Sequence, residues 1–140
     1  MSKVDLKLII AMARSYNQLF STLERHFQEM GLNGSEFGVL ECLYHKGEQP
    51  VQKVAEKILV TSGTITYVID KLQKKGLVVR KRCDKDKRIY YVHLTDEGYS
   101  LMCQLFPKHE AYLEELFSEL PEIWKCQLIE NLVDLQNAIK

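Results

Sequence analysis

The stretch from Gln49 to Gly98 constrains the fold of this chain most strongly, because three different patterns follow one another in it at short spacing. A short helix is expected from Gln52 to Ile58, and a second helix from Ser62 to Lys75, where Gly76 ends it. Residues 77–94 favour a β-hairpin, since two runs of β-branched and aromatic residues flank a polar loop. Two helices joined by a tight turn and followed by a basic hairpin are typical of a DNA-reading head.

The second helix has two faces, and Thr61 is expected to cap it through its hydroxyl. One face carries apolar residues at the spacing of a core-facing stripe. The other carries short polar side chains and suits a DNA groove, because hydroxyls both donate and accept hydrogen bonds. A glycine in the first turn would let the backbone approach a phosphate at the positive end of the helix dipole. The helix residues that we expect to contact DNA are Ser62, Gly63, Thr64, Thr66, Tyr67, Lys71 and Lys74.

Positive charge is concentrated in the same region, although the formal net charge of the chain is zero. From Lys71 to Arg88 there are nine basic and two acidic residues, so this stretch carries +7 and the remainder carries −7. Such a patch attracts polyanions. A charge run is more often a solvated face, but this one adjoins a helix-turn-helix pattern. In the hairpin we expect DNA contacts from Arg82, Lys85, Asp86, Lys87 and Arg88.

Arg88, the last of these residues, has a specific expected role. Asp86 could pair with Arg88 and hold the guanidinium extended. An arginine held in this way could enter a minor groove, where narrow A·T stretches concentrate negative potential.

Long helices are expected before and after the head. From Lys3 to Met30 apolar residues recur at spacings of three and four, and a second apolar stripe widens the face beyond what one small domain needs. Burial against a partner chain as well as the core would explain that width. Ser35 is expected to cap the following helix, 36–46, and Gly47 to end it.

Beyond the hairpin, Thr95 is expected to cap a helix that reaches about Glu119. Pro107 should kink or interrupt that helix, because proline lacks an amide donor. A last helix is expected from Glu122 to Ala138. The chain therefore predicts a mainly α fold with a small β-hairpin wing. Its 140 residues suggest one domain, 1–140, with a DNA-binding lobe at 35–98 and dimerisation helices at 1–30 and 99–140.

Composition argues against several other classes of protein. No apolar run approaches the roughly 20 residues that span a bilayer, and the charged N-terminus lacks signal-peptide features, which favours a cytoplasmic protein without a membrane partner. The four cysteines show no metal-ligand spacing, so neither a metal site nor a cofactor is expected. We expect no enzyme, since no nucleophile–base order, phosphate loop or paired carboxylates stand out and the histidines are isolated.

Several motifs resemble the MarR family of winged helix-turn-helix transcriptional regulators. The matching segments are Gln49-Pro50-Val51, Thr61-Ser62-Gly63-Thr64-Ile65-Thr66, Asp70-Lys71-Leu72, Lys75-Gly76-Leu77-Val78, Arg80-Lys81-Arg82, Asp86-Lys87-Arg88 and Leu94-Thr95-Asp96-Glu97-Gly98. The likeness is specific in the middle of the chain and architectural at both ends. The Ser-Gly-Thr-Ile-Thr segment is similar to the corresponding segment in the OhrR/MhqR-like branch of the family, whose members respond to organic peroxides and quinones. Peroxide sensors of that branch carry a cysteine near the start of the first helix, whereas this chain has none before Cys42.

The resemblance implies a sequence-specific DNA-binding regulator that acts as a homodimer on an inverted-repeat operator in double-stranded DNA. Repression is the expectation at the level of the family. The resemblance also implies that a small apolar, phenolic or quinone-type ligand could bind where the dimer helices meet the DNA-binding lobe. The residues that could line such a pocket are Tyr16, Phe20, Phe37, Tyr44 and His45. Ordinary packing is the alternative for these aromatic residues.

Two further alternatives stay open. Cys83 lies among basic residues that would favour its thiolate, so oxidation or alkylation there could disturb the wing. An exposed cysteine without a role fits the same pattern. For the whole chain, the alternative function is that of a non-regulatory architectural DNA-binding protein.

Overall fold

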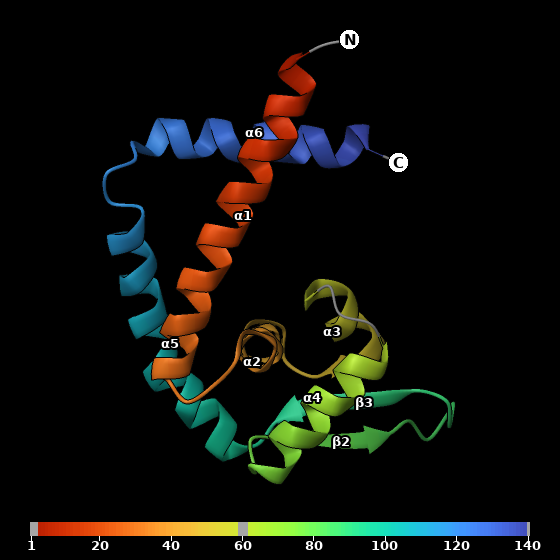
Figure 1. Cartoon of the computed structure of the whole chain (residues 1–140). Coiled ribbons are helices and arrows are strands. Elements are labelled where there is room, and N and C mark those ends of the chain that lie inside the picture. The colour runs from red at the N-terminus through yellow and green to blue at the C-terminus, as the bar shows by residue number, and fades with distance from the viewer. Residues whose placement is uncertain (1–2, 59–61, 140) are drawn as a thin grey trace. The chain divides into compact units, whose positions relative to one another are not determined.

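The computed structural model describes residues 3–58 and 62–139, and it divides into one compact unit up to Cys103 and a second from Gln104. The described residues form mainly helices with a small sheet (Figure 1), so the predicted mainly α fold with a hairpin wing is confirmed. The elements in chain order are α1 (Lys3–Glu29), α2 (Gly34–Lys46), β1 (Gln49–Pro50), α3 (Val51–Ile58), α4 (Ser62–Lys74), β2 (Val78–Arg82), β3 (Tyr90–Leu94), α5 (Asp96–Leu116) and α6 (Glu122–Ala138).

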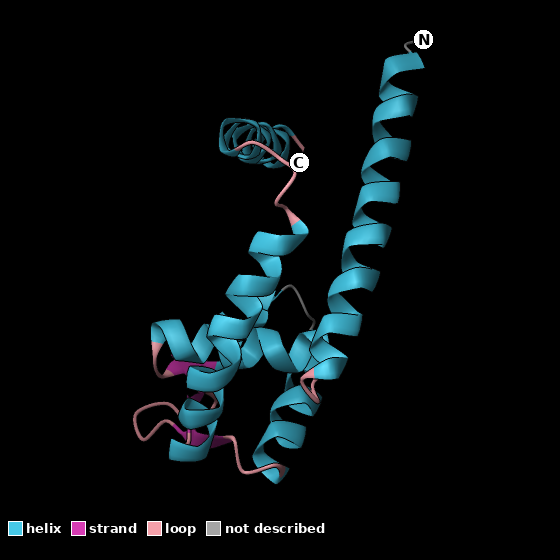
Figure 2. Ribbon diagram, turned by 90° about the vertical axis from the view of Figure 1, so that its left-hand side faces the viewer, coloured by secondary structure: helices cyan, strands magenta, loops and turns pink. Residues whose placement is uncertain are grey.

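The predicted hairpin is part of a three-stranded antiparallel sheet with the strand order β1-β3-β2. Strands are magenta in Figure 2. In β2 and β3, Arg82 stands opposite Tyr90. The loop between them is closed at its base by a hydrogen bond from the Cys83 amide to the Ile89 carbonyl, with an N···O distance of 2.8 Å. Gln49–Pro50 is expected to be extended, but its pairing with β3 is not predicted. Proline is tolerated there because an edge strand does not need every amide as a donor.

The core of the first unit is built by α2, α3, α4 and the sheet. Its fully buried side chains include Val39, Leu40, Val54, Ile65, Ile69, Leu72, Val78 and Val92. The α4 residues among them are those whose spacing predicts an inward face. Because burying one such side chain contributes roughly 1.5–3 kcal/mol, the core determines which face of α4 points outward.

The start of α2 differs from the prediction. Asn33, and not Ser35, is the N-cap: its side-chain oxygen accepts from the Glu36 amide at 2.8 Å. The Glu36 carboxylate in turn accepts from the Asn33 amide at 3.0 Å, which completes a capping box. Asn33 is the cap rather than Ser35 because the residue three positions later is a glutamate, whose carboxylate binds back to the amide of the cap. The predicted end at Gly47 is confirmed, with a φ of 74°, and the expected cap of α4, Thr61, lies outside the described residues.

The helix α5 begins as predicted and runs further than its proline suggests. The Thr95 hydroxyl accepts from the Gly98 amide at 3.0 Å and donates to the Gly76 carbonyl at 2.6 Å. The helix continues through Pro107 and ends at Leu116, before the predicted end near Glu119, so it is not interrupted at the proline; the alternative, a kink there, stays a prediction. One missing amide donor removes a single helical hydrogen bond, and the bonds of the neighbouring residues persist.

Exposed apolar side chains mark α1 in the first unit and α6 in the second. The last turns of α1 pack on α2, where the Phe27 and Phe37 rings stack with centroids 4.7 Å apart. Further towards the N-terminus, Leu6 and Ile9 are exposed. None of the described residues of α6 is buried. Among the described helices, none has both the length and the apolar character that crossing a membrane requires.

Candidate nucleic-acid interface

The outward face of α4 carries the residues that its sequence predicts for DNA contact. Thr64, Thr66, Lys71 and Lys74 are exposed, and 68% of Tyr67 is accessible. Ser62 and Gly63 begin the helix, but their exposure lies outside what the structure describes. With the opposite face fixed in the core, these hydroxyl, phenol and ammonium groups form one polar surface.

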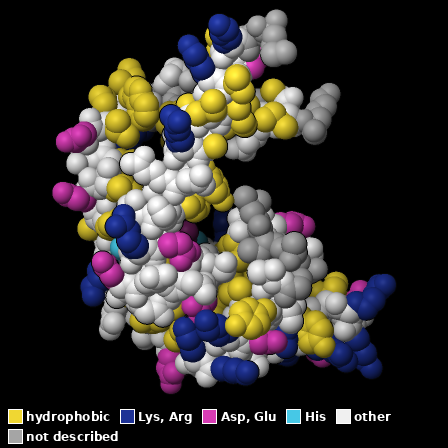
Figure 3. Space-filling model, in the orientation of Figure 1, with side chains coloured by type: hydrophobic (Ala, Val, Ile, Leu, Met, Phe, Trp, Pro, Cys, Tyr) yellow, Lys and Arg dark blue, Asp and Glu magenta, His cyan; other side chains and the backbone are white. Residues whose placement is uncertain are grey.

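The wing loop carries the second group of predicted residues. Lys85 and Lys87 are exposed, and Figure 3 shows Lys and Arg side chains gathered around this loop. The predicted pair is present: Arg88 donates from Nε to Asp86 Oδ1 and from Nη2 to Asp86 Oδ2, both at 3.1 Å. These bonds lower the pKa of Asp86 and raise the pKa of Arg88. Their bidentate geometry orients a guanidinium whose side chain is 90% exposed.

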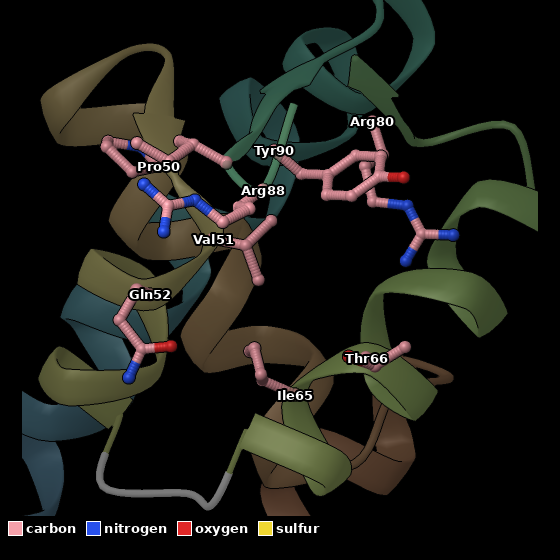
Figure 4. A pocket seen from close by; sticks show the side chains of 9 residues that line it. Pro50, Val51, Gln52, Ile65, Thr66, Arg80, Arg88 and Tyr90 are labelled. Atoms are coloured by element: carbon pink, nitrogen blue, oxygen red, sulfur yellow. The ribbon is translucent and has the colours of Figure 1, made fainter. Parts of the chain in front are cut away.

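A surface pocket of about 360 Å³ lies between the wing and the first turns of α3 and α4 (Figure 4). Its lining consists of Pro50, Val51, Gln52, Ile65, Thr66, Arg80, Arg88, Ile89 and Tyr90. In Figure 4 the Arg88 guanidinium is turned towards Pro50, whereas Arg80 lies on the side of α4. Arg88 therefore stands near the base of the wing loop, beside the start of α3.

Two arginines of β2 have different partners. Arg80 Nη2 lies 2.9 Å from Asp70 Oδ1 on α4, and the Arg80 amide donates to the Gln73 side chain at 3.0 Å. Arg82 donates from Nε and Nη2 to the Tyr90 hydroxyl at 3.1 and 2.8 Å. The sequence patterns place Asp70 on the outward polar face of the helix and Arg80 in the basic stretch, but they do not single out either residue, or Tyr90, as a site residue. The alternation of side chains along a strand is the signal that would have placed the two arginines on one face.

Acidic partners reduce the effective charge of the basic patch. Within the described residues, ion pairs join Lys75 to Glu36, Arg80 to Asp70 and Arg88 to Asp86. The other basic residues of the patch are exposed and have no acidic side chain within ion-pair distance in the described parts of the chain. These are Lys71, Lys74, Lys81, Arg82, Lys85 and Lys87.

The five residues predicted for a ligand pocket make ring contacts at separate places on α1 and α2, and Tyr44 also contacts Tyr99 of α5, with ring centroids 5.4 Å apart. Tyr16 and Phe20 are exposed on α1, with ring centroids 4.4 Å apart. Phe37 is buried against α1, as described above, and Tyr44 lies 5.3 Å from His45. Their common role in one pocket stays a prediction.

Cys83 is half-buried at the end of β2, where its amide closes the base of the wing loop. A modification of the thiol would therefore act where the loop joins the sheet, and the thiol switch stays a prediction. Across 3–58 and 62–139, no three His, Cys, Asp or Glu side chains gather as metal ligands would.

Comparisons with known proteins agree with this geometry. A family model described as the MarR family matches residues 32–90, which include the capping box, α4, β2 and the wing loop. The HTH-type transcriptional regulator MhqR of Bacillus subtilis (strain 168) is 43% identical over 122 residues, which are 87% of this chain and 84% of that protein.

Two solved structures have a similar fold. The transcriptional regulator BldR from Sulfolobus solfataricus gives a TM-score of 0.83 at 27% identity, over 99% of this chain and 100% of that one. BpsR of Bordetella bronchiseptica, whose DNA binding is regulated by 6-hydroxynicotinic acid, gives a TM-score of 0.82 at 20% identity, over 93% of this chain and 98% of that one. The match to MhqR, together with the exposed face of α4 and the basic wing, shows that the chain belongs to the MarR family of HTH-type, DNA-binding transcriptional regulators.

Proposed function

We propose that the protein is a homodimeric repressor that binds an inverted-repeat operator in double-stranded DNA. One observation carries the proposal: the polar face of α4 and the basic wing loop are both exposed on a single packed core. In a dimer, two α4 helices would enter successive major grooves about 34 Å apart. The proposal includes a cytoplasmic location and no enzymatic activity.

The proposed contacts fall into three groups. Bases and nearby phosphates would be contacted by Ser62, Gly63, Thr64, Thr66 and Tyr67. The DNA backbone would be bound by Lys71, Lys74 and Arg82. The wing loop, with Lys85, Asp86, Lys87 and Arg88, would meet the minor groove, and the bidentate Asp86 pair supports this because it orients the Arg88 guanidinium before DNA arrives.

Exposed apolar side chains support the homodimer. On α1, Leu6, Leu8 and Ile9 are exposed, and on α6 the same is true of Ile123 and Ile129. Large exposed apolar groups on amphipathic helices mark interaction surfaces, and a second copy of the chain would cover them. We propose that residues 1–140 form one MarR-type domain, with 35–98 as its DNA-binding lobe and 1–30 and 99–140 as its dimerisation helices.

The Arg88→Ala variant tests the wing. We expect weaker DNA binding and a shallower plot of log affinity against log salt, because a positive charge at the minor groove is lost. The measurement is a fluorescence titration at several salt concentrations, with Lys108→Ala, an exposed lysine outside the patch, as the control. Unchanged affinity and slope in Arg88→Ala would contradict the proposed wing contact.

The proposed signal is a small phenolic or quinone-type ligand. It would release DNA by favouring a spacing of the two heads that misfits successive grooves. BpsR, whose DNA binding is regulated by 6-hydroxynicotinic acid, is a precedent for control by a small aromatic molecule in a similar fold. Aromatic side chains at Tyr16, Phe20 and Tyr44 offer surfaces on which such a ring could stack. Modification of Cys83 is the second candidate, because it would distort the base of the wing.

One experiment separates these signals from each other and from an architectural protein. It is a mobility shift on the region upstream of the protein's own gene, with a panel of quinones, phenols and salicylate-like compounds, for the wild type and Cys83→Ser. We expect salt-sensitive, sequence-selective binding that one compound abolishes in both proteins. Loss of the response in Cys83→Ser alone, restored in the wild type by reductant, would establish the thiol route. Binding without selectivity that no compound releases would favour the architectural alternative.

A further inference from the structure

Arg80, Arg82 and Tyr90 form a cluster on one face of the wing. The two arginines lie two residues apart in β2, so their side chains point to the same side of the sheet. Tyr90 stands directly opposite Arg82 and diagonally from Arg80, a distance that long side chains span. The guanidinium carbons of Arg80 and Arg82 lie 5.5 and 5.3 Å from the centre of the Tyr90 ring.

Arg80 links the wing to α4. Its guanidinium is paired with the Asp70 carboxylate, and its amide is bound by the Gln73 side chain, so two consecutive turns of α4 hold the same residue of β2. The pair neutralises the charge of Arg80. Because its side chain is also only 28% exposed and is bound to α4, this arginine is suited to joining the helix to the wing rather than to contacting a phosphate.

Arg82 is held in a different way. Its partner is the Tyr90 hydroxyl, a neutral acceptor that takes two of the five guanidinium hydrogens. The side chain is exposed, so the remaining donors and the full positive charge face solvent. A neutral anchor orients the guanidinium without cancelling its attraction to DNA.

We propose that Tyr90 and Asp70 are positioning residues for DNA binding, with Tyr90 holding Arg82 as a pre-oriented phosphate contact and Asp70 confining Arg80 to the joint between α4 and the wing. The inference rests on the proposed contact of Arg82 with the DNA backbone. Because Arg80 joins α4 to the wing while Arg82 contacts phosphate, α4 and the wing meet DNA in a fixed relative orientation. A flexible arginine would lose more side-chain freedom on binding, so the Tyr90 hydroxyl strengthens the complex by roughly two- to tenfold.

The first test uses Tyr90→Phe, Arg82→Ala and the double variant. Affinity is measured against salt on a mixed-sequence 30-base-pair duplex and on a duplex selected by the wild type from a random pool. We expect Tyr90→Phe to weaken binding to both duplexes by roughly two- to tenfold with an unchanged salt slope, because the charge of Arg82 remains. Arg82→Ala should lower the slope by about 0.9, and Tyr90→Phe should then have no further effect.

Tyr91→Phe is the matched control, since Tyr91 is the next residue of the same strand and its side chain points to the other face. Urea unfolding of each variant shows whether stability has changed. An unweakened Tyr90→Phe protein would overturn the inference. Equal weakening by Tyr90→Phe in the presence and absence of Arg82 would also overturn it, because the hydroxyl would then act through the fold and not through Arg82.

The second test is Asp70→Asn. The substitution removes the carboxylate partner of Arg80, which should loosen the contact between α4 and the wing and leave the positive charge of Arg80 unpaired. The ratio of the affinities for the selected and the mixed duplex should therefore fall about twofold or more. An unchanged ratio would overturn the role of Asp70. Binding of the wild type to the selected duplex tests the DNA-binding function by itself, whereas the inference depends on the differences between variants.

Discussion

Replacing Gly98 with alanine is expected to destabilise the first unit by about 1–3 kcal/mol, the range typical of overpacking. Gly98 is buried in the first turn of α5, and a Cβ there would overlap the carbonyl oxygen of Leu77. That carbonyl cannot easily move, because it accepts the Thr95 amide at 3.0 Å. The Thr95 hydroxyl also binds the Gly76 carbonyl, so the turn between α4 and β2 is held at two adjacent points.

Urea unfolding is the measurement for Gly98→Ala, and Gly38→Ala is the matched control. Both glycines lie in helices, where alanine is favoured over glycine by up to about 1 kcal/mol. A Cβ on Gly38 would meet the Ile58 side chain, with Cγ2 at 3.1 Å and Cβ at 3.6 Å, and no backbone atom is among these contacts. We expect a clear loss of stability for Gly98→Ala and little change for Gly38→Ala. Equal midpoints for the two variants would show that the Leu77 turn can move aside.

Replacing Glu36 with alanine is expected to lower the free energy of unfolding by about 2–3 kcal/mol. The side chain is 3% exposed, pairs with Lys75 Nζ at 2.8 Å and accepts the Asn33 amide. Loss of a fully buried pair costs about 3–5 kcal/mol, but Lys75 is 37% exposed and stays partly hydrated. Glu36→Gln should cost less, because glutamine can still complete the capping box. Equal losses in the two variants would contradict a separate contribution from the capping hydrogen bond, whereas an unchanged stability of Glu36→Gln would contradict a contribution from the ion pair.

The same carboxyl group predicts a pH dependence. Burial by itself raises the pKa of Glu36, but hydrogen bonds from Lys75 and the Asn33 amide, with the charges of Lys75 and Lys71, outweigh it and leave the pKa lowered. A lowered pKa in the folded state stabilises the protein above the unfolded pKa, and this stabilisation is lost as the pH falls through the folded value. The stability difference between wild type and Glu36→Gln should therefore shrink on acidification below about pH 4.5.

Glu41→Gln serves as the control for this pH dependence. Burial raises the pKa of Glu41, so its ionised form is disfavoured in the folded protein. The stability difference between wild type and Glu41→Gln should therefore change in the opposite direction as the pH falls. If the stability differences for Glu36→Gln and Glu41→Gln changed with pH in the same direction, acid unfolding would be governed by other carboxyl groups.

The sequence by itself determined the helices, the faces of α4 and the hairpin. The spacing of Ile65, Ile69 and Leu72 depends only on the helical repeat, and the core indeed buries these residues. The Asp86–Arg88 pair was predictable for a similar reason, since two residues so close in sequence can meet whatever the rest of the chain does. The motifs of the middle of the chain also sufficed to indicate the family, which the match to MhqR shows.

The tertiary structure alone decided which distant residues meet. Packing of α2 against α4 brings Lys75 to Glu36, and packing of α5 on the turn before β2 places Gly98 against the Leu77 carbonyl. The division of Arg80 and Arg82 between Asp70 and Tyr90 likewise follows from the register of β2 and β3 and from their packing on α4. Hydrophobic periodicity specifies which face of an element is buried, but the partner of each polar side chain depends on how the buried faces fit together in space.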